Sequence, residues 1–174
     1  MIGRKYGSRK FFIATGLVGF LAILSTYYLG IFPIVTLRQS EILCPSPISI
    51  GEEVNPFGLG DSENGEQTLY YIQDLDDKDG FFSVRYTSDN ELIKKIRPLL
   101  NCEYTGGDVA TTQSRIILVI DGTITMRLEA SIVLDEAKPG LQVRSLGWLE
   151  FKKPQELKAE LDNLSPYLLP WLHI

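Results

Sequence analysis

RIILVIDGTITMRLEASIVLDE, residues 115–136, carries the most regular pattern in this chain. Across residues 124–134 every second side chain is apolar, and polar side chains at positions 125, 127, 129 and 131 alternate with them. A period of two is typical of a strand with one face on a core and the other in water. In RIILVIDG, residues 115–122, the apolar stretch 116–120 supplies both faces, as in a central strand, and Asp121-Gly122 favours a tight hairpin turn between the two segments. We therefore expect two neighbouring antiparallel strands here.

The segments on either side of this hairpin extend the predicted sheet. Residues 68–75 and 81–88 are rich in β-branched and aromatic side chains, and the turn-forming string DDKDG separates them, so we expect a second hairpin. Residues 141–151 follow the turn KPG and place apolar side chains on one face, at positions 141, 143, 149 and 151. This last segment is expected to be the third strand of a meander.

Two helices complete the predicted domain. Ser88 or Asp89 can cap a short helix with an apolar stripe at positions 92, 93 and 96, which Pro98 limits. A second helix is expected near Pro154, with leucines at 157, 161 and 164 along one side. The order β-β-α-β-β-β-α predicts an α+β domain at residues 68–174, with about five strands in a mainly antiparallel sheet and the C-terminal helix packed on it.

Residues 11–37 predict a membrane anchor. They contain no ionisable side chain other than two tyrosines. At about 1.5 Å of rise per residue, residues 11–32 alone would cross a hydrocarbon core of about 30 Å. A cleaved signal peptide would need small residues at a cleavage site, and no good small-x-small pair is present there. We therefore expect one uncleaved transmembrane helix, a signal-anchor, that binds the lipid bilayer through residues 11–37.

Basic residues predict the orientation of this anchor. Arg4, Lys5, Arg9 and Lys10 precede the apolar segment, and only Arg38 follows it closely. The positive-inside rule then places residues 1–10 in the cytoplasm and the C-terminal domain outside it, in a single-pass membrane protein. A bacterial plasma membrane is the default, with a thylakoid or another organellar membrane as the alternative. Residues 38–67 are rich in Pro, Gly, Ser and acids and are expected to form a linker.

The charge balance argues against nucleic acid as a partner. The net charge is −5, but after residue 37 the chain has 13 basic and 22 acidic side chains. A domain of about −9 repels phosphate, and no cluster of Lys and Arg with interleaved aromatic residues offsets this.

The two cysteines are candidates for a disulfide. Cys44 and Cys102 are the only cysteines in the chain, and both follow the predicted anchor. A bridge would close a loop of about 59 residues and would stabilise the fold by roughly 3 to 4.5 kcal/mol on the chain-entropy model. The alternative is two unconnected thiols. No C-x-x-C motif supports a redox-active pair.

No set of residues predicts catalysis or a bound metal. The only histidine is His173, next to the last residue, so neither a Ser-His-Asp triad nor a histidine metal site can be assembled. The acids between Asp74 and Gly80 fail the EF-hand pattern at both ends, and a hairpin turn explains them better. We therefore expect no enzyme activity and no cofactor.

The C-terminal residues are unusually apolar for a chain end. Tyr167, Leu168, Leu169, Trp171 and Leu172 are expected either to be buried against the domain or to form a docking surface. The anchor, the acidic domain and this tail favour a membrane-anchored accessory protein that binds another membrane or envelope protein. The alternative is a domain that binds a lipid or another apolar ligand between the long strands and the last helix.

Overall fold

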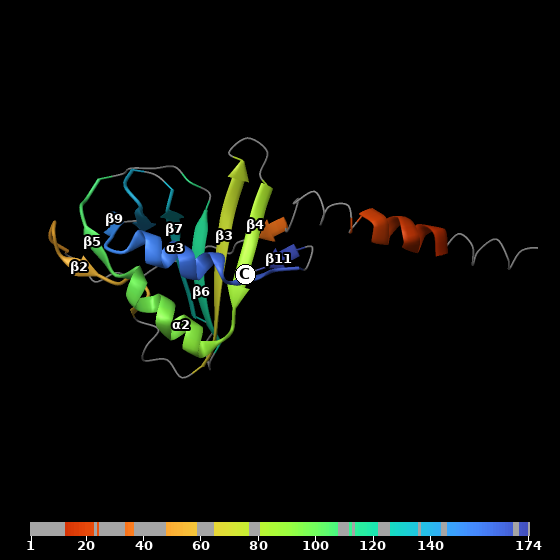
Figure 1. Cartoon of the computed structure of the whole chain (residues 1–174), viewed down its shortest axis with the longest axis horizontal. Helices are drawn as coiled ribbons and strands as arrows, with labels where there is room; N and C mark the ends of the chain where they lie inside the picture. The colour runs from red at the N-terminus through yellow and green to blue at the C-terminus, as the bar shows by residue number, and fades with distance from the viewer. Residues whose placement is uncertain are drawn as a thin grey trace, which may run out of the picture.

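The computed structural model of the chain is shown in Figure 1. It describes residues 13–22, 24, 34–36, 48–58, 65–76, 81–107, 112, 114–121, 126–135, 137–143, 146–168 and 171–173. These residues form a nine-stranded antiparallel sheet, a two-stranded parallel sheet and several helices.

The nine-stranded sheet has the order β10-β4-β3-β6-β7-β8-β9-β5-β2. Its strands are β2 (Glu53–Val54), β3 (Glu66–Asp76), β4 (Phe81–Thr87), β5 (Cys102–Tyr104), β6 (Arg115–Asp121), β7 (Met126–Val133), β8 (Gly140–Val143), β9 (Gly147–Phe151) and β10 (Ser165–Pro166). Every neighbouring pair is antiparallel. The segments around the alternating sequence thus lie at the centre of the sheet, with short strands at both edges.

The register of the central strands assigns side chains to the two faces. Leu118 of β6 is opposite Leu69 of β3 and opposite Leu128 of β7. Neighbours in a register row point to the same face, so these leucines share one face of the sheet. The adjacent row points to the other face and holds Ile117 and Glu129.

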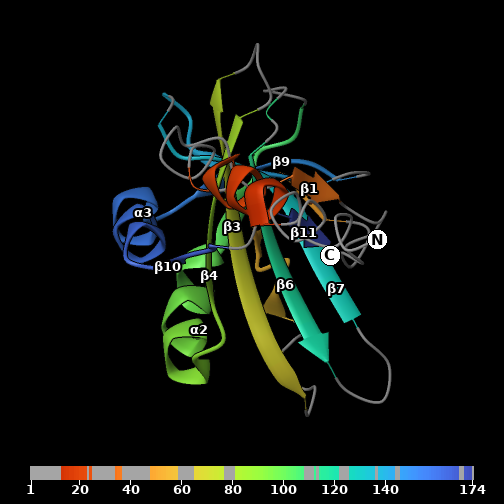
Figure 2. The same cartoon turned by 90° about the vertical axis from the view of Figure 1, so that its right-hand side faces the viewer.

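Helices cover the leucine face. Helix α2 (Asn90–Ile96) begins after Asp89, whose carboxylate accepts a hydrogen bond from the Glu91 N–H, and it continues as the 3₁₀ helix η2 (Arg97–Leu100). Helix α3 (Pro154–Asp162) has proline in its first turn. Figure 2 shows α2 and α3 on one side of the sheet.

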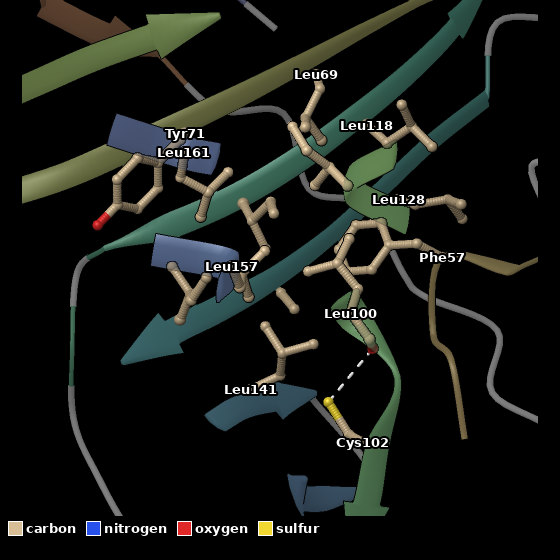
Figure 3. Close-up of a cluster of buried hydrophobic side chains, with 14 of the residues drawn as sticks. Phe57, Leu69, Tyr71, Leu100, Cys102, Leu118, Leu128, Leu141, Leu157 and Leu161 are labelled. Atoms are coloured by element: carbon tan, nitrogen blue, oxygen red, sulfur yellow. Dashed lines mark hydrogen bonds between the residues drawn. The ribbon is translucent and has the colours of Figure 1, made fainter. Parts of the chain in front are cut away.

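A single hydrophobic cluster fills the space between these helices and the sheet. Leu157 and Leu161 of α3 are fully buried and belong to the same cluster as Leu118, Leu128 and Leu141 of the sheet. Figure 3 shows their side chains together with Phe57 and Cys102. Burial of a leucine contributes about 1.5–3 kcal/mol, so this cluster is a main source of stability.

The opposite face of the sheet, here called the helix-free face, has a cluster of its own. Its buried members are Ile72, Val84, Ile117 and Leu172. Leu172 comes from β11 (Trp171–His173), which pairs in parallel with β1 (Ile34–Thr36). The C-terminal strand therefore covers part of the helix-free face.

The predicted transmembrane helix at residues 11–37 is contradicted by the structure. The helix described in this segment covers residues 13–22, which rise about 15 Å, half of a hydrocarbon core of about 30 Å. Residues Ile34–Thr36 form a strand, and residues 11, 12, 23, 25–33 and 37 lie outside the described part. No helix among the described residues is long and apolar enough to cross a membrane. The single-pass localisation and the signal-anchor interpretation are therefore not supported.

The predicted count of about five strands is also wrong, because the main sheet has nine. Residues 141–151 form two strands rather than one, since β8 and β9 pair with each other as a hairpin. Gly147 has a φ of 106°, which a side chain with a Cβ rarely adopts, and it begins β9 directly after the turn. The remaining additional strands, β2, β5 and β10, have only two or three residues.

Part of the segment predicted as a linker, residues 38–67, belongs to the folded domain. Strand β2 pairs with β5 through Val54 and Cys102, and Phe57 is fully buried in the main cluster. The side-chain amide of Asn55 donates a hydrogen bond to the Arg97 carbonyl and thereby fixes this segment to η2. Residues 38–47 and 59–64 lie outside the described part.

Candidate functional site

The helix of residues 13–22, here called the apolar helix, carries five of the exposed large apolar side chains in the described part of the chain. These are Ile13, Leu17, Val18, Phe20 and Leu21, which are 53–71% exposed. Single exposed apolar residues are ordinary, but a contiguous set marks a surface that another molecule covers. The apolar helix is therefore the first candidate binding site.

The spacing on the apolar helix places these side chains on adjoining turns. Ile13, Leu17, Phe20 and Leu21 stand at i, i+4, i+7 and i+8, so they form one stripe along the helix. Such a stripe is the pattern by which a helix docks into an apolar groove. A Cβ added to Gly16 or Gly19 would meet no atom within 4 Å, so the surface beside the stripe is also open.

The predicted docking residues at the C-terminus have different environments. Tyr167 contacts the rings of Tyr70 and Tyr86, with centroid distances of 6.4 and 5.6 Å. Leu172 is buried on the helix-free face, whereas Leu168 is 59% exposed. Leu169 and the side chain of Trp171 lie outside the described part. The described tail thus combines residues that fix it to the domain with one that faces solvent.

The helix-free face also holds a network of charged side chains. Glu129 accepts a hydrogen bond from Arg127 at 2.6 Å and lies 3.4 Å from the Arg115 guanidinium. Arg115 also donates to the Ser131 hydroxyl at 2.8 Å. Burial lowers the pKa of Arg127, while the attraction of Glu129 and its hydrogen bond oppose that change. Since one carboxylate holds two guanidinium groups, this network fixes β6 to β7.

Asp74 lies on the same face as this network. Both of its carboxylate oxygens are buried and have no hydrogen-bond partner among the described residues. Its backbone N–H donates to the Ser114 hydroxyl at 3.0 Å. The described residues contain no group of three His, Cys, Asp or Glu side chains that could bind a metal ion with this carboxylate.

A hollow of about 220 Å³ lies on strands β5 and β9, next to the edge strand β2. Glu103, Thr105, Glu150, Phe151 and Lys152 line it. Glu103 and Glu150 are opposite each other in the register, and neither forms an ion pair with a described residue. The hydrogen bond that Lys152 donates to the neighbouring Glu53 lowers the pKa of that carboxyl. The two carboxylates and the lysine give this hollow a charged character.

Cys102 is a free and fully buried thiol. Its Sγ lies 3.3 Å from the Leu100 carbonyl, and burial raises the pKa of the thiol (Figure 3). A buried thiol with a raised pKa is a poor nucleophile, so Cys102 contributes packing rather than reactivity. Cys44 lies outside the described residues, and the disulfide between the two stays a prediction.

The acids of the β3–β4 hairpin are divided between a strand and its turn. Asp74 and Asp76 belong to β3, and residues 77–80 lie outside the described part. The strands on either side are antiparallel, with an irregular register between Asp74 and Asp76. His173 belongs to β11, and its side chain is also outside the described part.

The charged network and the hollow were not predicted from the sequence. Arg127 and Glu129 occupy the polar positions of the alternating strand, which predicts that they face water. The structure leaves their side chains only 10% and 16% exposed. Opposite charges two residues apart on a strand were the available signal, since such side chains share one face.

Comparison with protein-family models, with curated proteins and with solved structures gave no match.

Proposed function

We propose that this chain is a non-catalytic accessory protein that binds another protein through the apolar helix of residues 13–22. The observation that carries the proposal is the exposure of five large apolar side chains on this helix. Covering them would remove apolar surface from water, at about 25 cal/mol per Å². The described residues hold no group of three His, Cys, Asp or Glu side chains that could bind a metal ion.

The sequence around the helix defines the chemistry of the partner. The apolar segment contains no Asp, Glu, Lys or Arg, so the partner surface must be an apolar groove. Arg4, Lys5, Arg9 and Lys10 precede the segment, and a carboxylate-rich rim at one end of the groove would complement them. The proposed partner is a protein with an apolar groove and an acidic rim.

The alternative, an apolar ligand held between the strands and the last helix, has less support. Leu157 and Leu161 of α3 and the leucines of the sheet belong to one packed cluster in that space. A ligand there would have to displace buried side chains, each worth about 1.5–3 kcal/mol. We therefore do not favour this function.

Photo-crosslinking tests the proposed function. A photoreactive amino acid in place of Leu17 should capture one protein reproducibly, and the same probe at Ile50 is the control. Ile50 is 78% exposed but lies at the start of the folded domain. The captured protein is then purified, and its affinity is measured by titration with the full chain.

The titration decides the outcome. We expect Leu17→Asp to weaken binding at least about tenfold, because it places a charge in an apolar groove, whereas Ile50→Asp leaves binding unchanged. Replacing Arg9 and Lys10 with Glu should also weaken binding, and the loss of affinity should be larger at low salt than at high salt. Equal affinities of the Leu17→Asp and Ile50→Asp chains would contradict the proposal.

A further inference from the structure

Strand β11 connects the two ends of the chain. It pairs in parallel with β1, and the register joins Ile34 to Trp171, Val35 to Leu172 and Thr36 to His173. Within the described residues these strands form a sheet of their own, separate from the nine-stranded sheet. The N-terminal strand therefore reaches the domain by way of the C-terminal strand.

Two contacts hold the C-terminal segment on the domain. The Tyr167 N–H donates a hydrogen bond to the Val84 carbonyl at 2.9 Å, and the Tyr167 ring packs edge-on against Tyr70 and Tyr86. Farther along, Leu172 is only 3% exposed and lies in the cluster of the helix-free face. Leu168, between these contacts, is 59% exposed. Leu172 is thus the described side chain that fixes β11 to the sheet.

We propose that β11 is a latch, which holds the N-terminal segment on the helix-free face and so limits how far the apolar helix can extend from the domain. The inference rests on the proposed function, because it concerns the distance between the domain and a partner bound to that helix. It depends on the β1–β11 pairing and on the burial of Leu172, which together join the N-terminal segment to the C-terminal strand and that strand to the sheet.

Chain length gives the size of the effect. Eleven residues, 23–33, stand in the sequence between the apolar helix of residues 13–22 and β1, which begins at residue 34, and they limit the reach when the latch is closed. Without the latch, the next described residue is Ile48, which packs against the main cluster and lies 26 residues after residue 22. At about 3.5 Å per residue the maximum reach is roughly 40 Å with the latch closed and roughly 90 Å with it open. The latch thus keeps the domain and the partner close, which raises the effective concentration of each for the other.

Hydrogen exchange on the full chain tests the latch without any partner. We would follow the amides of Ile34–Thr36 and those of β6 by NMR in two variants, Leu172→Asp and the control Leu168→Asp. Both variants replace a leucine with aspartate, and the two positions differ in burial. Leu172→Asp should speed exchange in β1 about tenfold or more and leave β6 protected, because it opens a local structure. Leu168→Asp should change neither.

A second variant covers a failure of Leu172→Asp to fold. A chain that ends at Pro170 removes β11 and adds no buried charge. If β1 keeps its protection in this chain, β1 does not depend on β11 and the latch is wrong. If β6 loses its protection in both variants, the tail is an integral part of the core, and the latch is wrong as well.

The reach itself can be measured by pulsed electron spin resonance. Spin labels on cysteines that replace Leu21 and Ile50, in a Cys44→Ser chain, report the distance between the apolar helix and the start of the domain. We expect longer and broader distances with Leu172→Asp than with Leu168→Asp, and identical distributions would overturn the latch. Failure to find a partner for Leu17 would leave these results intact, so the two proposals can fail separately.

Discussion

Gly140 occupies a position where a side chain has no room. A Cβ built there would lie 2.3 Å from the Leu149 carbonyl oxygen and 2.8 Å from the Trp148 ring. Neither the backbone carbonyl nor the fully buried indole can move freely, so the substitution must displace β8 from β9. We predict that Gly140→Ala lowers the free energy of unfolding by about 1–3 kcal/mol, measured by urea denaturation.

Gly58→Ala is the matched control for this prediction. A Cβ at Gly58 would make its nearest contact at 3.7 Å, with the side chain of Asn55, which is ordinary van der Waals distance. Its stability should stay within about 0.5 kcal/mol of the unchanged chain. If the two variants are equally stable, the close packing of Trp148 on Gly140 is incorrect.

The thiol of Cys102 should be unreactive in the folded protein. In a Cys44→Ser chain it is the only cysteine, so any reaction with a thiol reagent at pH 8 reports on it alone. Burial raises its pKa, so the folded state holds the protonated thiol while the unfolded chain ionises near the ordinary value of about 8.5. The free energy of unfolding therefore does not depend on this thiol below about pH 8.5, and it falls as the pH rises above that value, because only the unfolded chain loses the proton.

Reaction of Cys102 is measured with and without denaturant. We expect one thiol to react at once in urea and almost none over the same time in buffer. Fast reaction in buffer would show that the thiol is accessible. Mass spectrometry of the unmodified chain, before and after reduction, separately tests the disulfide with Cys44.

At the scale of elements, the sequence predicts long strands well and short ones poorly. The alternation over residues 124–134 locates β7, and the apolar run before it locates β6, because each has enough residues to define a period. Strands β2 and β10 have two residues each, which is too few to show any period. Their pairing depends on the edges that β5 and β4 offer, and those edges exist only in the folded chain.

The pairing of distant segments also decides the structure of the apolar segment at residues 11–37. Composition alone makes residues 11–37 resemble a membrane span, because hydropathy does not register that Ile34–Thr36 form a strand. The strand at Ile34–Thr36 forms because β11 lies beside it, more than 130 residues later in the chain. The sequence also could not show which residues of the tail are exposed, because the exposure of Leu168 and the burial of Leu172 depend on tertiary packing.

Helix α3 depends on the leucine stripe that its sequence predicts. Leu161 is fully buried in the main cluster, against side chains of the sheet and of the neighbouring helices. We predict that Leu161→Ala lowers the free energy of unfolding by about 2–5 kcal/mol, because it removes buried apolar surface and leaves a cavity. Leu168→Ala, in the exposed part of the tail, should change it by less than about 0.5 kcal/mol. Thermal unfolding of both variants, followed by circular dichroism, checks the difference.

Taken as a whole, the nine-stranded sheet has two faces that are covered by different means. The helices and the main cluster cover one face, and the C-terminal strand covers part of the other. Every buried member of the two clusters comes from Val54 or a later residue. The folded domain therefore begins before residue 68, the boundary that the sequence predicts, and includes the segment that contains β2.

Two shortened chains test where the domain begins. A chain of residues 48–174 keeps β2, Val54 and Phe57, so it should unfold cooperatively with nearly the stability of the full chain. A chain of residues 68–174 lacks all three and leaves β5 without its edge partner. Loss of the fully buried Phe57 ring alone should cost about 3–5 kcal/mol, a large share of the 5–15 kcal/mol that is typical of a domain. We therefore expect the shorter chain to be at least about 3 kcal/mol less stable in urea, or unfolded. Equal stability of the two chains would mean that residues 48–58 do not contribute to the core.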